Sequence, residues 1–412
     1  MIKYVGALAA LVVLAATGCG EKELSAGGVD AGPVADAAAG GAGGGGAGGG
    51  GGGMAPPQTP YPDGCAGDAD CADGARCRLG ICVPAPDVSR QLAFSCQDVP
   101  RPQSRPTLGC FDDPAPLAEG PAAVPARGKV EYFGDGNQTV GLRVRFYPYQ
   151  TFDPSPCVDV AGREPDVAAR RALTEACVDG LGAPIADTTT VECDPPDPES
   201  GCYAVDALPT GQRLVVRITG DLDEWVPTYH YGLFINPCAV PVVRDESGAC
   251  PEDFPGAADA DWACDLTADA GGDYYLRNLS VISQATWTSF PPTAGLPRIN
   301  LGNGAVAGRL FDCEGRSVIN ASFELAHPGA KRTFFNGNPD DLLPQPGLTY
   351  TNTRGTYASL DTPPGPNGLV AVGRRGADEV PTVAYERFFL LPDTITLLNP
   401  TGRRPLEEEP PF

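Results

Sequence analysis

Hydrophobic and polar residues alternate in three stretches of the chain, and this pattern predicts β-strands. Residues 140–147 place apolar side chains at every second position, at Val140, Leu142, Val144 and Phe146. Residues 214–218 and 319–325 alternate in the same way. A period of two is typical of strands with one buried face. Short strands separated by Gly, Pro and Asp turns therefore predict an all-β protein built from antiparallel β-sandwiches.

The strand-rich part contains an internal repeat. Residues 128–136 match residues 308–315, and residues 201–211 match residues 355–365. The two separations are 180 and 154 residues, so the first copy carries an insertion of 26 residues. A repeat of this kind indicates two copies of one structural unit. We expect two tandem sandwiches, over residues 126–297 and 298–402.

The insertion holds the one helix expected in the exported chain, from Pro165 to Cys177. Pro suits the first turn of a helix, and the following residues favour helix and include no Gly. Cys157 and Cys177 bracket this helix and are expected to staple it. The last strand of the first copy has two candidates, residues 229–235 and 274–283, and the sequence does not decide between them.

Residues 1–18 have the pattern of a signal peptide. Lys3 precedes an apolar run from Val5 to Ala16, and small residues precede Cys19. The run is too short for a membrane-spanning helix, which needs ~20 residues. The stretch resembles a bacterial lipobox, which implies a lipid on Cys19. An ordinary signal peptide with an incidental Cys is the alternative. By the same resemblance, Gly20 favours the outer membrane, with the periplasmic or surface face left open.

Four further segments lack the pattern of a sandwich. Residues 19–60 are rich in Gly and Ala and are expected to be a disordered tether, because they hold too little apolar surface to fold. Residues 61–85 form a cysteine-rich knot. Residues 86–125 read as a Pro-rich connector laid on the next domain, and residues 403–412 as a disordered acidic tail.

The cysteine count supports an oxidising compartment. The chain has 15 Cys, and lipidation of Cys19 leaves an even number for disulfides. These are Cys65, Cys71, Cys77, Cys82, Cys96, Cys110, Cys157, Cys177, Cys193, Cys202, Cys238, Cys250, Cys264 and Cys313. Among the three connectivities possible in the knot, we expect Cys65–Cys77 with Cys71–Cys82, and we expect Cys96 to pair with Cys110. The sequence has no Cys-x-x-Cys pair typical of zinc sites, so we expect no metal there. Calcium at the Asp residues of the knot stays open.

The net charge and the small number of His residues argue against two classes of function, nucleic-acid binding and catalysis. The net charge is −23 with two His, which argues against nucleic-acid binding. Neither His230 nor His327 stands in a zinc-carboxypeptidase motif, and the chain lacks Gly-x-Ser-x-Gly. We therefore expect no catalytic residues, no cofactor and no enzyme activity.

The knot resembles small cysteine-rich modules of the dickkopf N-terminal type, through its Cys spacing and its Gly80-Ile81-Cys82 ending. The two repeats resemble the carboxypeptidase regulatory-like domain. In the first copy this rests on Gly128, Gly136, Gly201, Tyr203, Leu208, Pro209 and Gly211. In the second it rests on Gly308, Asp312, Gly315, Thr353, Gly355, Tyr357, Leu360 and Gly365. The resemblance implies transthyretin-like, Ig-like β-sandwiches. The whole resembles bacterial outer-membrane lipoproteins of the myxobacterial type.

These features predict a non-enzymatic, lipid-anchored envelope protein for binding, adhesion or scaffolding. The alternative is an accessory carbohydrate- or peptide-binding subunit of a secreted hydrolase system. Aromatic residues near the join of the two copies are the candidate ligand contacts, chiefly Tyr229, Tyr231 and Trp287, with Tyr274, Tyr275 and Phe290 beside them. Core packing is the competing explanation for all of them. The expected partners are the membrane, through the lipid, and a glycan or another envelope protein. The oligomeric state stays open.

Overall fold

A computed structural model describes most of the chain after residue 63. It covers residues 64–95, 106, 108, 122–133, 138–161, 164–198, 200–235, 267–269, 272–276, 278–312, 316–335, 343–345, 347–352 and 354–400. Contacts divide the chain into Met1–Pro56 and Pro57–Phe412, and the described residues belong to the second unit. The expected signal peptide, tether and acidic tail lie outside the described residues. No helix within the described ranges has the length and apolar character needed to cross a membrane.

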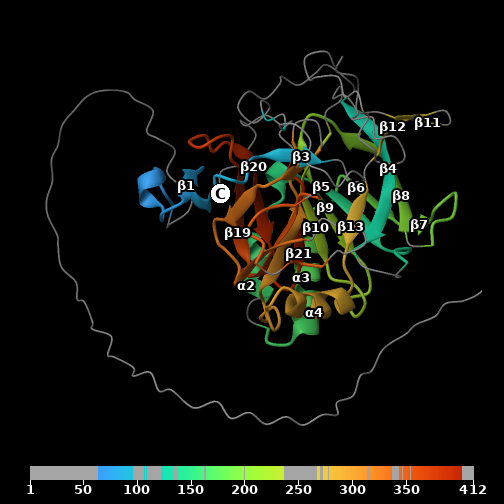
Figure 1. The fold of residues 1–412 in the computed structure, drawn as a ribbon. Coiled ribbons are helices and arrows are strands. Elements are labelled where there is room, and N and C mark those ends of the chain that lie inside the picture. The colour runs from blue at the N-terminus through green and yellow to red at the C-terminus, as the bar shows by residue number, and fades with distance from the viewer. Residues whose placement is uncertain are drawn as a thin grey trace, which may run out of the picture. The chain divides into compact units, whose positions relative to one another are not determined.

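β-Strands are the predominant regular element of the described residues (Figure 1), as the alternating pattern predicts. The strands are β1 (Ala75–Arg78), β2 (Ile81–Pro84), β3 (Ala93–Ser95), β4 (Ala123–Tyr132), β5 (Arg143–Pro148), β6 (Ala186–Thr189), β7 (Val191–Glu192), β8 (Ser200–Pro209), β9 (Arg213–Thr219), β10 (Thr228–Phe234), β11 (Thr267–Asp269), β12 (Gly272–Leu276), β13 (Leu279–Val281), β14 (Gly304–Arg309), β15 (Ser317–Ile319), β16 (Ser322–Leu325), β17 (Lys331–Phe334), β18 (Thr356–Thr362), β19 (Gly365–Val372), β20 (Thr382–Leu390) and β21 (Ile395–Leu398). The helices are η1 (Asp68–Asp70), η2 (Tyr149–Thr151), α2 (Ser155–Ala161), α3 (Val167–Gly180) and α4 (Gln284–Thr293).

The two repeats pair their strands in the same way. In the first copy β4 pairs with β8, and Gly128 faces Tyr203. In the second copy β14 pairs with β18, and Gly308 faces Tyr357. The Gly and Tyr residues that match between the two repeats therefore occupy equivalent positions in the two pairs of strands.

The last strand of each copy runs parallel to the first strand of the same copy. β13 runs parallel to β4 in the first copy, and β21 runs parallel to β14 in the second. β10 and β20 are the corresponding strands of the opposite layers, where they pair with β9 and β19. Both candidates for the last strand of the first copy are thus strands, and β13 takes the closing position.

The two sandwiches share one sheet. Within the described residues, eight strands follow one another in the order β17-β18-β14-β21-β10-β9-β5-β6. The copies meet where β10 pairs in parallel with β21, with Thr228 opposite Ile395. Two copies expected in tandem are therefore joined edge to edge by backbone hydrogen bonds.

The first sandwich has its core between β4, β8 and β13 on one side and β5, β9 and β10 on the other. Val130, Phe146, Leu214 and Ile218 are buried in this layer. The alternation predicts one buried face for β5 and β9, and this is wrong, because every residue of β9 is buried. The outer face of β9 and β10 belongs to the core cluster of the second sandwich, through Val215 and Tyr229, and α2 and α3 add to it through Cys157 and Val178.

The helical insertion is stapled as expected, and its helix has shifted bounds. The disulfide Cys157–Cys177 joins α2 to α3. α3 begins after Asp166, whose side chain accepts a hydrogen bond from the Ala169 N–H at 2.8 Å. Asp is a strong N-cap, so Pro165 precedes the helix instead of opening it. α2 and α4 were not expected from the sequence.

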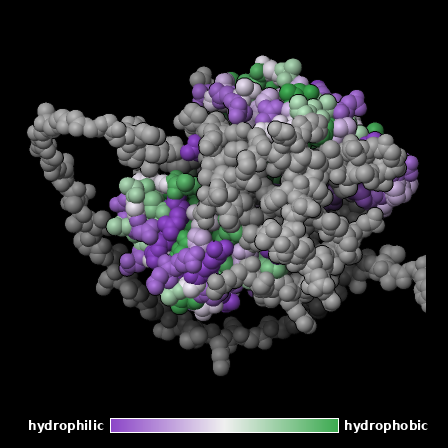
Figure 2. All heavy atoms as spheres, turned by 90° about the horizontal axis from the view of Figure 1, so that it is seen from above, coloured by the Kyte–Doolittle hydropathy of each residue, from purple (hydrophilic) through white to green (hydrophobic). Residues whose placement is uncertain are grey.

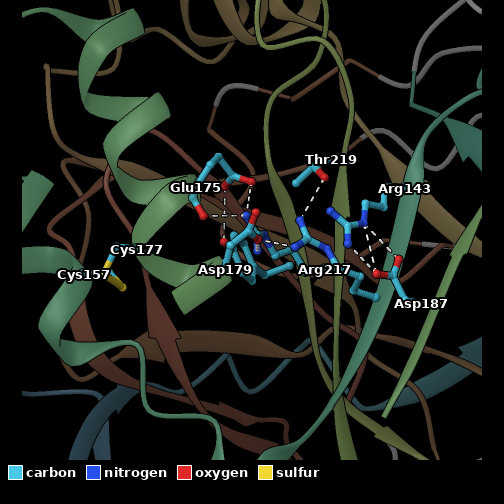
Figure 3. A network of polar contacts seen from close by, with 10 residues as sticks. Arg143, Cys157, Glu175, Cys177, Asp179, Asp187, Arg217 and Thr219 are labelled. Carbon is cyan, nitrogen blue, oxygen red and sulfur yellow. Dashed lines mark hydrogen bonds and ion pairs between the residues drawn. A yellow bond between two sulfur atoms is a disulfide. The ribbon is translucent and has the colours of Figure 1, made fainter. Parts of the chain in front are cut away.

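Two arginines buried in the shared sheet pair with acidic residues of the helical insertion, of which Glu175 is largely buried and Asp179 is exposed (Figure 3). Arg217 of β9 is fully buried and pairs with Glu175 and Asp179 of α3. Arg145 of β5 also pairs with Asp179. Burial raises the pKa of Glu175 more than Arg217 lowers it. Burial alone would lower the pKa of Arg217, but the neighbouring Tyr229, Glu175 and Asp179 raise it.

Two more buried ion pairs cross from the first copy to the second. Arg213 of β9 lies 3.4 Å from Glu386 of β20, and both side chains are about 1% exposed. Arg170 of α3 pairs with Asp393, next to β21. Buried charges are tolerated only when they are paired, so these contacts fix the two sandwiches in one arrangement.

The knot and connector pack on the second sandwich, although the first follows them in sequence. β3 pairs with β15, with Phe94 opposite Val318. Arg78 donates to the Val380 carbonyl at 2.9 Å, and Ile81 and Val83 join the second core. The disulfides Cys65–Cys77, Cys71–Cys82 and Cys193–Cys202 are present, the first two in the expected pairing. Cys96, Cys110, Cys238, Cys250, Cys264 and Cys313 lie outside the described residues.

Candidate ligand-binding site

A cavity of about 260 Å³ opens where the two sandwiches meet. Its floor is formed by β14, β18 and β21 of the second copy, and its walls by β4 and β13 of the first copy together with α4. Ligand sites in proteins are concave, largely apolar and carry a few placed polar groups, often at domain interfaces. The coloured residues visible in Figure 2 mix hydrophilic and hydrophobic side chains.

The sheet forms the floor as three rows of side chains that face the cavity. Pairing registers place Leu360, Ala305 and Ile395 in the first row, Ala358, Ala307 and Leu397 in the second, and Thr356, Arg309 and Asn399 in the third. Residues two apart on a strand lie on the same face, so these nine residues share one side of the sheet. Two apolar rows are followed by a polar row. The small Ala side chains leave the space above the middle of the floor.

Aromatic rings close the apolar end. Phe290 and Phe335 stack with ring centroids 5.5 Å apart, and Phe133 meets each of them edge to face at 6.3 and 6.1 Å. Trp287 lies one turn before Phe290 on α4, and both line the cavity. The rings come from the first copy, from α4 and from the second copy, so the end is built only when all three are in place.

Hydrogen bonds hold α4 over the cavity. The Ser283 hydroxyl caps the helix by accepting from the Thr286 N–H at 3.2 Å. The Gln284 side chain donates to the carbonyls of Leu222 and Trp225 at 3.1 Å each. Helix α4 is hard to predict because Thr, Trp, Phe and its two Pro residues have low helix propensity. Its capping Ser is the signal that could have located it.

Polar side chains gather at the other end. Asn278 donates to Glu131 at 3.0 Å, and the Arg309 N–H donates to Asn399 at 2.9 Å. Glu131 lies at the exposed mouth, where the surrounding protein partly desolvates its carboxyl and raises its pKa against the lowering effect of Arg309 and Lys129. This end offers one carboxyl group, one guanidinium cation and several amide and hydroxyl groups.

Of the three candidate ligand contacts, one lines the cavity and two lie in the protein core. Trp287 lines the cavity, half-buried. Tyr229 and Tyr231 are 1% and 6% exposed in the core beneath the helical insertion. Their assignment as ligand contacts is therefore corrected, because β10 is covered on both faces. Tyr274 and Tyr275 have side chains outside the described residues.

The histidine and acidic residues considered for other chemistry have structural roles where they are described. His230 is buried in β10, and its Nε2 lies 2.8 Å from the carbonyl oxygen and 3.3 Å from the nitrogen of Ser280 on β13, so it donates to the first or accepts from the second, according to its tautomer. In the knot, Asp68 accepts from the Cys77 N–H at 2.8 Å, and Asp70 accepts from Ala66 and Gly67. Sulfur atoms of Cys65, Cys71 and Cys82 lie close together, but all three are in disulfides and offer no thiolate.

Comparisons with known proteins identify no family. No family model matches the sequence, and no curated protein matches it. Among solved structures, the shaft pilin SpaA from Lactobacillus rhamnosus GG is 10% identical and aligns over 68% of this chain and 97% of its own, with a TM-score of 0.15. A streptococcal ancillary pilin is 11% identical over 68% of this chain and 62% of its own, with a TM-score of 0.16. The minor pilin GBS52 of Streptococcus agalactiae is 8% identical over 67% and 94%, with a TM-score of 0.15. Likeness at these TM-scores says nothing about which fold or function the chain has.

Proposed function

We propose that this chain is a non-catalytic, lipid-anchored protein of the cell envelope that captures a ligand between its two sandwiches. The observation that carries the proposal is the cavity, because both copies and α4 contribute to its lining. Its apolar floor and polar mouth are the usual composition of a binding site. Buried ion pairs and the β10–β21 ladder hold the copies together, so the site is preorganised.

The likeness of the repeats to carboxypeptidase regulatory-like domains supports a binding role, since that domain is not the catalytic part of the peptidases that carry it. Trp287 and its aromatic neighbours also suit the second candidate, an accessory subunit that holds a carbohydrate or peptide for a secreted hydrolase. Both functions use the same cavity.

The cavity is tested by filling it. Ala307→Leu, on the middle row of the floor, is expected to weaken binding of the uncharged fluorescent probe N-phenyl-1-naphthylamine about tenfold or more, because a tenfold loss needs only ~1.4 kcal/mol of lost contact. The measurement is a fluorescence titration of residues 19–412 carrying Cys19→Ala, so that no lipid competes.

The matched control is Ala204→Leu on the exposed side of β8. It makes the same change in side-chain volume away from the cavity and is expected to leave the probe affinity unchanged. Equal affinities of the two variants, or no saturable binding to the parent protein, would contradict a binding role for the cavity.

The lipid anchor is tested by labelling. Cells fed an alkyne-tagged fatty acid are expected to attach the tag to the parent protein and not to the Cys19→Ala variant, because the Cys19 sulfur is the proposed acceptor. Sucrose-gradient fractionation of the labelled protein should place it in the outer membrane. Equal labelling of both proteins would remove Cys19 as the anchor, and absence of label from both would leave an ordinary signal peptide.

A further inference from the structure

We propose that the cavity selects an amphiphile with an uncharged, hydroxyl-bearing head, such as a short glycolipid. This inference rests on the proposed function and specifies its ligand. It is carried by a polarity gradient that runs in one direction on both sides of the cavity, and by the balance of charge at the polar end.

The floor shows the gradient along its strands. Rows of side chains two residues apart are ~6.6 Å apart, so the three rows extend over ~13 Å. The first two rows are apolar, and the third holds Thr356, Arg309 and Asn399, with the ring of Phe311 lining the cavity two residues beyond Arg309. An extended octyl chain covers about the first two rows, which leaves its head at the third.

The opposite wall repeats the gradient. Phe133, just after β4, lies at the aromatic end, and Glu131 of β4, two residues before it, lies at the mouth. On β13 and its flanks, Ile282, Ser280 and Asn278 pass from apolar to polar in the same direction. The pairing of Ser280 with Glu131 aligns the two strands. Because Glu131 also feels the charge of Arg309 across the cavity, the polar ends of wall and floor coincide.

The charges at the polar end disfavour a charged head. Among the described lining residues, Glu131 and Arg309 are the ionisable groups, and their charges are opposite. A carboxylate head near Arg309 would be repelled by Glu131, and an ammonium head near Glu131 would be repelled by Arg309. Hydroxyl groups avoid both penalties, because Asn278, Asn399 and Thr356 offer donors and acceptors to them.

The ligand class is tested by displacing N-phenyl-1-naphthylamine with compounds that share an octyl chain and differ in the head. Octyl glucoside, octanoate and octyltrimethylammonium are compared below their micelle concentrations, with glucose as the control for the head alone. We expect octyl glucoside to displace the probe at concentrations at least about tenfold lower than either ion, and glucose to displace none.

Glu131→Gln provides a readout specific to the charge balance. The variant should bind octanoate more tightly and octyltrimethylammonium more weakly, while octyl glucoside changes less than about threefold. Thr356→Val should weaken octyl glucoside alone. Far-ultraviolet circular dichroism checks that both variants stay folded.

The outcomes separate the two proposals. Displacement by octanoate or octyltrimethylammonium at the same or lower concentration than octyl glucoside overturns the inference and leaves the binding function standing. Probe binding that none of the octyl compounds displaces also overturns it. Failure of the parent protein to bind the probe overturns the proposed function as well.

Discussion

Arg217→Ala is expected to lower the free energy of unfolding by about 3–5 kcal/mol, the usual cost of removing one partner of a buried ion pair. Arg217 is fully buried on β9 and pairs with Glu175 and Asp179. Its loss leaves the carboxylate of Glu175, on the sheet-facing side of α3, without its main cation. Urea unfolding monitored by circular dichroism measures the change.

Arg143→Ala is the matched control, because Arg143 pairs with Asp187 on neighbouring strands of the same sheet (Figure 3). The two side chains are 49% and 35% exposed, so the loss should be under ~1 kcal/mol. Equal losses for the two Arg variants would show that the buried network contributes no more than a surface pair.

The Arg217→Ala defect should also depend on pH. Burial raises the pKa of Glu175 in the folded protein, and without Arg217 the pKa should rise further. A carboxyl whose pKa is higher in the folded state favours folding when protonated, and this contribution is lost as the pH rises through the folded pKa. The variant should therefore lose less stability, relative to the parent protein, at pH 5 than at pH 8.

Gly308→Ala is expected to cost about 3 kcal/mol or more of unfolding free energy, at the upper end for an overpacked site. A Cβ atom on Gly308 would overlap the backbone oxygen of Leu398 on β21. That oxygen also accepts the hydroxyl of Tyr357 at 2.9 Å, so the backbone cannot retreat without breaking this bond. Thermal unfolding of the variant measures the loss.

Gly180→Ala makes the same change at the end of α3, where a Cβ atom meets nothing within 4 Å. It should be neutral or stabilising by up to ~1 kcal/mol, because Ala favours helix over Gly. A Gly308→Ala protein as stable as this control would refute the close approach of β14 and β21.

The same residue shows how much of the fold could be predicted. Gly308 and Tyr357 stand out in the sequence because they match Gly128 and Tyr203 of the other copy, and the ladders place Gly308 opposite Tyr357 and Gly128 opposite Tyr203. Residues of this kind recur at equivalent positions of the two repeats, so they can be recognised in a single sequence. The mostly β fold, the insertion and three disulfide pairs could be anticipated in the same way.

Contacts between the copies could not be predicted, because they depend on which surfaces meet. The pairing of β10 with β21 leaves no periodic signal, and neither does the packing of the helical insertion and the second core that buries Tyr229 and Tyr231. The alternating pattern predicts that Arg213 and Arg217 lie on the exposed face of their strand. In the structure β20 and the helical insertion cover that face. The candidate site shares this limit: Trp287 could be named from its aromatic surroundings, whereas Glu131, Phe133 and Arg309 meet only when the copies join.

The most direct test of a binding site between the sandwiches is hydrogen exchange of residues 19–412, carrying Cys19→Ala, with and without N-phenyl-1-naphthylamine. Binding in the cavity should slow exchange in peptides that cover β13 and α4, β14, and β18, and leave β6 and β8 unchanged. Slowed exchange confined to other strands, or no change at a saturating probe concentration, would contradict a ligand site at the junction.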